Sequence, residues 1–130
     1  MESNVDLCRK NAILQFEKLV KQAEELIRSD LSAEQAVAVW TSKGNIFSFA
    51  NHSIMFGNME DENNFVKILE KSGNKEIKYV VCMWNDTTFD IPSCHLRNLL
   101  IELNSSNLET EILLKNGEGF QAKSLKMLIP

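Results

Sequence analysis

Three side chains of types that bind transition metals occur in the middle of the chain, at His52, Glu60 and Cys94. Imidazole, carboxylate and thiolate groups are all ligands that zinc accepts. Their spacing matches no metal-binding motif, and ligand-type residues that share no motif are usually a chance cluster. A metal site rebuilt from these residues is therefore kept only as an alternative.

The cysteines themselves exclude two kinds of small protein. Cys8, Cys82 and Cys94 are the three cysteines of the chain, and they lie far apart in the sequence. An odd, scattered set does not form a disulfide scaffold or a zinc ribbon built from paired C-x-x-C motifs. We expect Cys94 to pack as a small buried side chain and His95 to be solvated where a helix starts.

Length and charge narrow the class of protein further. A chain of 130 residues is long enough to bury one core, so we expect a single domain, 1–130. The net charge of −4 and the pI of 5.2 argue against a nucleic-acid partner bound through a basic surface. No apolar run approaches the ~20 residues that span a bilayer, and the first residues do not resemble a signal peptide. We therefore expect a cytoplasmic protein with no membrane partner.

Hydrophobic periodicity predicts helices that alternate with strands after an initial hairpin. The turn Ser42-Lys43-Gly44-Asn45 lies between two apolar runs, which is typical of a hairpin. The predicted helices are Val5–Arg28, Glu60–Lys71, Pro92–Leu103 and a short one at Ser124–Ile129, and the predicted strands are Ala36–Thr41, Ile46–Asn51, Ile77–Trp84, Leu108–Leu114 and a small one at Phe120. This order predicts an α/β fold, a three-layer α/β/α sandwich with a mixed five-stranded sheet.

Several strings of the sequence resemble the cytidine deaminase family, in particular its small nucleoside and blasticidin-S deaminase-like members. No single string is specific, and the resemblance rests on their co-linear spacing over nearly the whole chain. The strings are the turn and strand from Ser42 to Asn51, Glu60-Asp61-Glu62 starting nine residues after Asn51, the strand after Gly73, Pro92-Ser93-Cys94-His95-Leu96-Arg97, and the ending from Ser124 to Pro130.

The resemblance implies a zinc site whose ligands this chain lacks. The family holds zinc by His or Cys at one helix start and by two Cys at another, and these positions are Glu60, Ser93 and Leu96 here. The glutamate that moves the proton falls on Glu62. Zinc lowers the pKa of bound water by roughly 8 units, a bias of about 11 kcal/mol that one glutamate cannot replace. We therefore expect no metal and no cofactor.

The resemblance also implies where a nucleoside would bind. Asn51 falls on the position that contacts the ribose, and Ser53 is the next contact position. Relatives carry an aromatic side chain before the first strand that stacks on the base, whereas residues 29–33 contain none. We expect the segment 56–59, Phe-Gly-Asn-Met, to fill the old pocket as an apolar plug. Alternatively, Asn51 is a turn residue at a strand end, and Glu60 to Glu62 are charges that favour a helix N-terminus.

Three functions follow from these observations. The leading hypothesis is a catalytically inactive protein of the cytidine deaminase fold with a remaining role in binding or assembly. The alternatives are an active cytidine or blasticidin-type deaminase with an atypical metal site, and a sensor of a nucleoside-like small molecule. Relatives are often dimers or tetramers that share active sites across subunits, so the resemblance implies a homo-oligomer formed through the helices that begin at Glu60 and Pro92.

Overall fold

Helices and strands alternate along the chain after a β-hairpin, as the periodicity predicts. The structure, a computed structural model, describes residues 4–117 and 119–128, and the side chains of residues 11–115, 117 and 119–128. In chain order the elements are α1 (Asn4–Ser29), β1 (Gln35–Thr41), β2 (Ile46–Asn51), α2 (Glu60–Ser72), β3 (Ile77–Trp84), β4 (Phe89–Asp90), α3 (Cys94–Leu103), β5 (Glu111–Asn116) and β6 (Gly119–Ser124), with 3-10 turns η1 (Ile54–Phe56), η2 (Ser105–Glu109) and η3 (Leu125–Leu128).

The strands form one mixed sheet in the order β2-β1-β3-β5-β6. The short strand β4 also pairs with β3 but is not part of this linear order. All pairings are antiparallel except that of β3 with β5. In the hairpin, Val37 lies opposite Phe49 and Gln35 lies opposite Asn51. This register places Gln35 and Asn51 at the end of the sheet that faces the start of α2.

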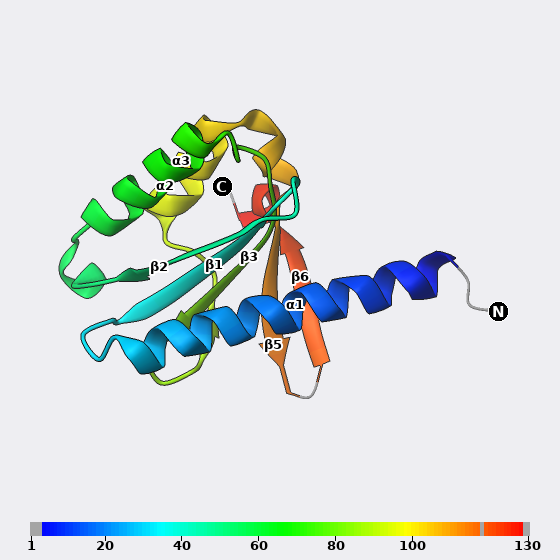
Figure 1. Cartoon of the computed structure of the whole chain (residues 1–130), viewed down its shortest axis with the longest axis horizontal. Helices are drawn as coiled ribbons and strands as arrows, with labels where there is room; N and C mark the ends of the chain where they lie inside the picture. The colour runs from blue at the N-terminus through cyan, green and yellow to red at the C-terminus, as the bar shows by residue number, and fades with distance from the viewer. Residues whose placement is uncertain (1–3, 118, 129–130) are drawn as a thin grey trace.

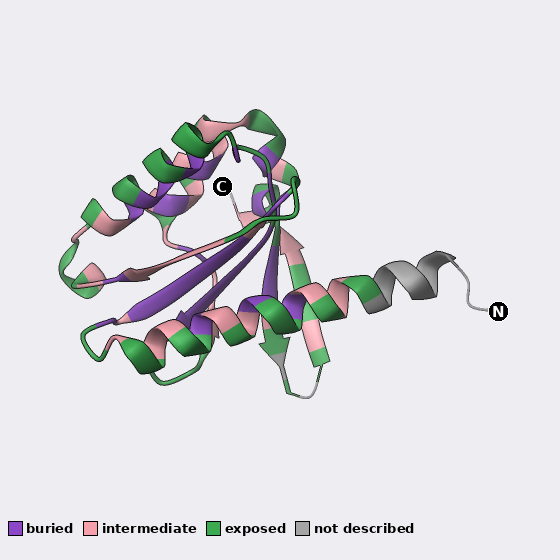
Figure 2. Cartoon of the chain, in the orientation of Figure 1, coloured by how far each residue is buried: buried purple, intermediate pink, exposed green. Residues whose placement is uncertain are grey.

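Helices cover both faces of the sheet, with α1 on one side and α2 and α3 on the other (Figure 1). Alternation along the strands supplies a core to each side. Val37, Val39, Val80 and Cys82 pack toward α2 and α3, while Ala38, Tyr79 and Val81 pack with Phe16 and Leu19 of α1. Figure 2 shows that β1 and β3 are buried along almost their whole length, as expected for central strands covered on both faces.

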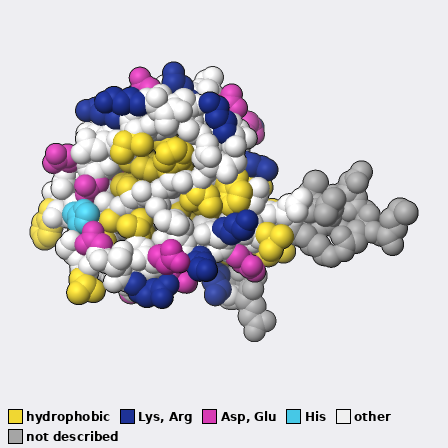
Figure 3. Space-filling model, viewed as in Figure 1, with side chains coloured by type: hydrophobic (Ala, Val, Ile, Leu, Met, Phe, Trp, Pro, Cys, Tyr) yellow, Lys and Arg dark blue, Asp and Glu magenta, His cyan; other side chains and the backbone are white. Residues whose placement is uncertain are grey.

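The strand β2 forms one edge of the sheet and is less covered than β1. Hydrophobic side chains gather on the surface over β2, between α1 and the layer of α2 and α3 (Figure 3). Ile46 is 37% exposed, and Phe47 and Phe49 are half-buried. Phe49 stacks on Phe65 of α2 with ring centroids 4.3 Å apart, so the apolar surface continues into the core between the sheet and α2.

The predicted fold class, an α/β sandwich with a mixed sheet, is confirmed, and the largest differences from the predicted elements lie in the last third of the chain. The last two strands are the hairpin β5–β6, in which β5 begins at Glu111 rather than Leu108 and β6 extends from Gly119 to Ser124. The predicted loop before Pro92 contains the short strand β4, and the final helix is a 3-10 turn. Ile129 and the side chain of Cys8 lie outside the described part of the chain. Within that part, no helix is long and apolar enough to cross a membrane.

Candidate functional site

The helix α2 begins with three acidic residues, and the third of them points into the protein. The side-chain oxygen Oδ1 of Asn58 accepts a hydrogen bond from the backbone N–H of Glu60 at 3.0 Å, which satisfies one free donor at the helix start. Acidic side chains here are also favoured by the helix dipole. Glu60 is exposed, whereas Glu62 is only 1% exposed. A buried carboxylate is costly unless hydrogen-bond donors surround it, so its partners define the site.

Ser93 is the first of these partners and comes from the start of α3. Its hydroxyl lies 2.8 Å from both carboxylate oxygens of Glu62 and donates its single proton between them. The same hydroxyl oxygen accepts a hydrogen bond from the backbone N–H of Leu96 at 3.0 Å and thereby caps α3. Ser93 therefore joins the N-terminal ends of α2 and α3 through Glu62.

Asn51, at the end of β2, is the second partner of Glu62. Its amide nitrogen Nδ2 donates to Oε2 of Glu62 at 3.1 Å and to Oε1 of Gln35 at 3.1 Å. Both Asn51 and Gln35 are buried, and the oxygen Oδ1 of Asn51 makes no hydrogen bond within the described part of the chain. We call Gln35, Asn51, Glu62 and Ser93 the Glu62 cluster. It connects β1, β2, α2 and α3 beneath the protein surface.

Cys82 of β3 lies near the Glu62 cluster, and its thiol is unreactive. Its side chain is fully buried, and that burial, together with the negative charges of Glu62 and Asp90, raises the pKa of the thiol far above its usual value. Asp90 is held by a hydrogen bond from the indole N–H of Trp84 at 2.9 Å. Because thiolate is the nucleophilic and metal-binding form of cysteine, Cys82 offers neither function here.

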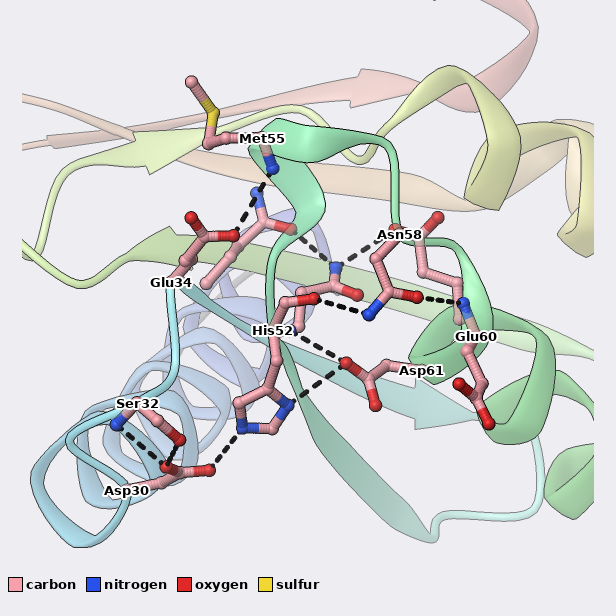
Figure 4. Close-up of polar contacts among 11 residues, drawn as sticks. Asp30, Ser32, Glu34, His52, Met55, Asn58, Glu60 and Asp61 are labelled. Carbon is pink, nitrogen blue, oxygen red and sulfur yellow. Dashed lines mark hydrogen bonds and ion pairs between the residues drawn. The ribbon is translucent and has the colours of Figure 1, made fainter.

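His52 sits between two carboxylates next to the Glu62 cluster (Figure 4). Its ring nitrogen Nε2 is 2.7 Å from Oδ2 of Asp30, and Nδ1 is 3.1 Å from Oδ2 of Asp61. A neutral imidazole carries one N–H and can donate to only one of them, so this arrangement favours the doubly protonated ring. Hydrogen bonds to Asp30 and then Asp61 accordingly raise the pKa of His52 above its usual value.

Asp30, one of the two partners of His52, also holds the segment that follows α1 in place. Oδ1 of Asp30 accepts hydrogen bonds from the hydroxyl of Ser32 at 2.6 Å and from its backbone N–H at 3.0 Å. These bonds from Ser32, together with the bond from His52, lower the pKa of Asp30. Asp61, the other partner of the His52 ring, also accepts a hydrogen bond from the backbone N–H of His52 at 2.8 Å. His52 thus ties the segment after α1 to the start of α2.

The residues implied as ligand contacts separate into two groups. Asn51 and Glu62 meet in the Glu62 cluster, and both are buried. Ser53 is exposed, with φ +58° in the left-handed region, and no side-chain hydrogen bond joins it to the cluster. A role of Asn51 and Ser53 in binding a ligand stays a prediction.

The donor set at the implied ligand positions does not fit zinc. The Ser93 hydroxyl donates a hydrogen bond to Glu62 and accepts one from the backbone N–H of Leu96. The Leu96 side chain is fully buried in the apolar core and has no atom that could ligate a metal. Both ring nitrogens of His52 face aspartates, so His52 does not combine with Glu60 and Cys94. Among the described residues, no group of three or more His, Cys, Asp or Glu side chains is placed to hold a metal ion.

Three local expectations are corrected. Cys94 is exposed rather than buried, because it occupies the first position of α3 on the side away from the buried Leu96. His95 is half-buried and its Nε2 is 2.7 Å from Oδ1 of Asn63, so it is not a freely solvated residue. The expected apolar plug is also wrong: Phe56 is 89% exposed, because the η1 turn, which follows Ser53 with its positive φ, directs the ring outward.

Gln35 and Cys82 lie in the site region, and the sequence pattern assigns neither of them a role there. The hairpin register could have found Gln35, because extending the pairing from the turn places Gln35 directly opposite Asn51. Cys82 falls on a continuous apolar strand, where no local signal distinguishes it from its neighbours.

Comparison with known proteins identifies the fold. No family model and no curated protein sequence matches the chain. Solved structures of cytidine deaminases do match. The enzyme from Mycobacterium leprae superposes with a TM-score of 0.65 at 19% identity, over 88% of this chain and 97% of that one.

Two further structures agree. The cytidine deaminase from Mycobacterium tuberculosis gives a TM-score of 0.65 at 16% identity, over 88% of this chain and 94% of that one. The enzyme from Burkholderia pseudomallei gives 0.60 at 17% identity, over 88% and 95%. At such identities the likeness concerns the fold and not the activity. This chain has a cytidine deaminase-like fold.

Proposed function

We propose that this chain is a catalytically inactive, zinc-free protein of the cytidine deaminase fold whose remaining function is assembly with other chains. One observation carries the loss of activity: the carboxylate at the position of the proton-moving glutamate is 1% exposed and accepts its hydrogen bonds from Ser93 and Asn51. The hydroxyl of Ser93, at an implied zinc-ligand position, is therefore hydrogen-bonded to the carboxylate that would have to accept a proton in a deaminase. The Glu62 cluster acts instead as a polar connection between four elements.

The chemistry of the remaining positions supports the same proposal. Glu60 is exposed and Leu96 offers no donor atom, so Ser93 has no partner ligands with which to hold zinc. The deaminase reaction depends on metal-activated water in this fold family. No other group in the Glu62 cluster lowers the pKa of water, since its members apart from Glu62 are a serine and two amides.

The test of inactivity measures ammonia release and bound metal on the purified protein. We expect no release from cytidine or blasticidin S above a no-protein control, and much less than one equivalent of zinc. One equivalent of zinc that disappears in Glu60→Ala or Cys94→Ala, or ammonia release that requires Glu62, would overturn the proposal. Combining Glu60→Cys, Ser93→Cys and Leu96→Cys provides a positive control, because this variant should take up zinc if the fold aligns those positions.

Assembly is supported by the outer surface of α2 and α3. A groove of about 420 Å³ runs between them, with the apolar side chains Val66, Leu99 and Leu103 among charged ones. On α2, Ile68 is 53% exposed. A second copy of the chain would cover such partly apolar helix surfaces, in line with the interface that the family resemblance implies.

Sedimentation analysis of Ile68→Glu tests assembly. We expect the wild-type chain to sediment as a dimer or a larger oligomer and Ile68→Glu to shift it toward monomer. Leu14→Glu is the matched control, because Leu14 is 55% exposed but lies on α1, on the opposite face of the sheet. A wild-type monomer at high concentration, or equal effects of both variants, would reject this interface.

A further inference from the structure

A second hollow lies on the other face of the sheet, away from the Glu62 cluster. It is a groove of about 670 Å³ between α1, Phe89 of β4 and the β5–β6 hairpin. Volumes of roughly 300–1,000 Å³ are typical of sites for small molecules. Nothing in the family resemblance assigns a role to this face, and the proposed loss of deaminase chemistry does not involve it.

The floor of the groove is aromatic. The Phe16 ring lies between two others, stacked on Phe120 with centroids 5.1 Å apart and tilted against Phe89 at 6.0 Å. Phe16 is buried, whereas Phe89 and Phe120 are half-buried and line the groove. Phenylalanine rings pack well with flat apolar groups in offset-stacked or edge-to-face geometry. The floor therefore suits an aromatic ring system.

The rim of the groove has an excess of positive charge. Lys21, Arg28 and Lys115 line it together with two carboxylates, Glu17 and Glu24. None of the three cationic side chains makes an ion pair within the described part of the chain. The charged side chains of the groove thus sum to +1, whereas the whole chain carries −4. One negatively charged group on a ligand would neutralise the net charge of +1 on these side chains.

We propose that this groove binds a small aromatic monocarboxylate, with its ring on Phe89 and Phe120 and its carboxylate against the cationic rim. An apolar body without charge would leave the lysines without a partner, and a polyanion would be repelled by Glu17 and Glu24. Aromatic stacking and a single charge pair together select this class of ligand.

Two isosteric probes test the proposal on the full chain, 2-naphthoate and the neutral 2-naphthamide. Calorimetric titration should show that 2-naphthoate binds with a dissociation constant on the order of 1 mM or lower, and more tightly than 2-naphthamide. Amide chemical shifts in NMR spectra should change around Phe16, Phe89 and Phe120. Absence of 2-naphthoate binding, equal affinity for both probes, or shifts confined to the α2–α3 groove would overturn the proposal.

Three variants separate the charged and the aromatic parts of the site. Lys115→Glu should weaken 2-naphthoate about five- to tenfold and leave 2-naphthamide unchanged. Lys71→Glu makes the same charge change on α2 and should leave both affinities unchanged. Phe120→Leu keeps an apolar side chain but removes the stacking ring, so it should weaken both probes. Equal effects of Lys115→Glu and Lys71→Glu, or a change of oligomeric state in Lys115→Glu, would show that the groove is not this site.

Discussion

Ser93 makes two contacts that can be separated by substitution. Its hydroxyl caps α3 through Leu96 N–H and donates to the buried Glu62. Replacing Ser93 by alanine removes both contacts. Replacing it by glycine removes the hydrogen bond to Glu62 but costs the helix cap only a few tenths of a kcal/mol, because glycine is accepted at this position.

The expected losses follow from the burial of Glu62. A buried charged group that loses a hydrogen-bond donor costs about 1–3 kcal/mol, and an alanine at a helix cap costs about 1 kcal/mol. We therefore expect the free energy of unfolding to fall by about 1–3 kcal/mol in Ser93→Gly and by about 2–4 kcal/mol in Ser93→Ala. The control Asn104→Gly removes the side-chain cap of η2, which touches no buried carboxylate, and should cost less than 1 kcal/mol.

Urea unfolding followed by circular dichroism measures these differences. With a slope of about 1–3 kcal/mol per molar urea, the midpoint of Ser93→Ala should drop by about 1 M or more. The Glu62→Gln background completes a double-mutant cycle, in which Ser93→Gly should cost clearly less than in wild type. If Ser93→Gly is no worse than Asn104→Gly and the cycle shows no coupling, Glu62 does not depend on Ser93 and our reasoning about the cluster fails.

Two further predictions concern His52 and the cysteines. Because contacts with Asp30 and Asp61 raise the pKa of His52 above 6.5, the folded state holds this proton more tightly than the unfolded state, and the stability that results is complete below about pH 6.5 and lost as pH rises through the raised pKa. Unfolding measured across this window should show the decline in wild type and not in His52→Gln; an unchanged pH dependence in the variant would contradict the assignment. Peptide mass spectrometry after alkylation should find Cys94 modified rapidly and Cys82 only on unfolding, since Cys82 is buried with a raised thiol pKa; equal rates would contradict this.

Elements with a strong apolar period were predictable from sequence, and those set by distant polar contacts were not. The predicted strand Ile77–Trp84 has the observed bounds, because its apolar run ends at turn residues on both sides. The apolar pattern predicts the start of the last long strand too early, at Leu108, whereas β5 begins at Glu111. There Asn107 accepts the backbone N–H of Ile77 and donates to the carbonyls of Lys75 and Leu100, which holds 105–109 in a 3-10 turn.

The site shows the same division. The family spacing brought Glu62 and Ser93 to the two helix starts that meet, and it placed Asn51 at the adjoining strand end. It could not reveal that the Ser93 hydroxyl donates a hydrogen bond directly to the Glu62 carboxylate, because this depends on side-chain rotamers where four elements meet. The outward turn of Phe56 was equally hidden, because apolar character alone predicts burial and the backbone of η1 decides the direction.

The parallel pairing of β3 with β5 has a consequence for how the molecule opens. β1 and β3 share seven paired positions, whereas β3 and β5 share two, Tyr79 with Glu111 and Val80 with Ile112. The side chain of Thr110 adds a hydrogen bond to the carbonyl of Ile77 at 2.7 Å, at one end of this short seam. We expect β5, β6 and η3 to detach as one unit before the hairpin β1–β2 and β3 separate, which native-state hydrogen exchange would resolve. A ligand in the groove between α1 and the β5–β6 hairpin would bridge the seam and slow that detachment.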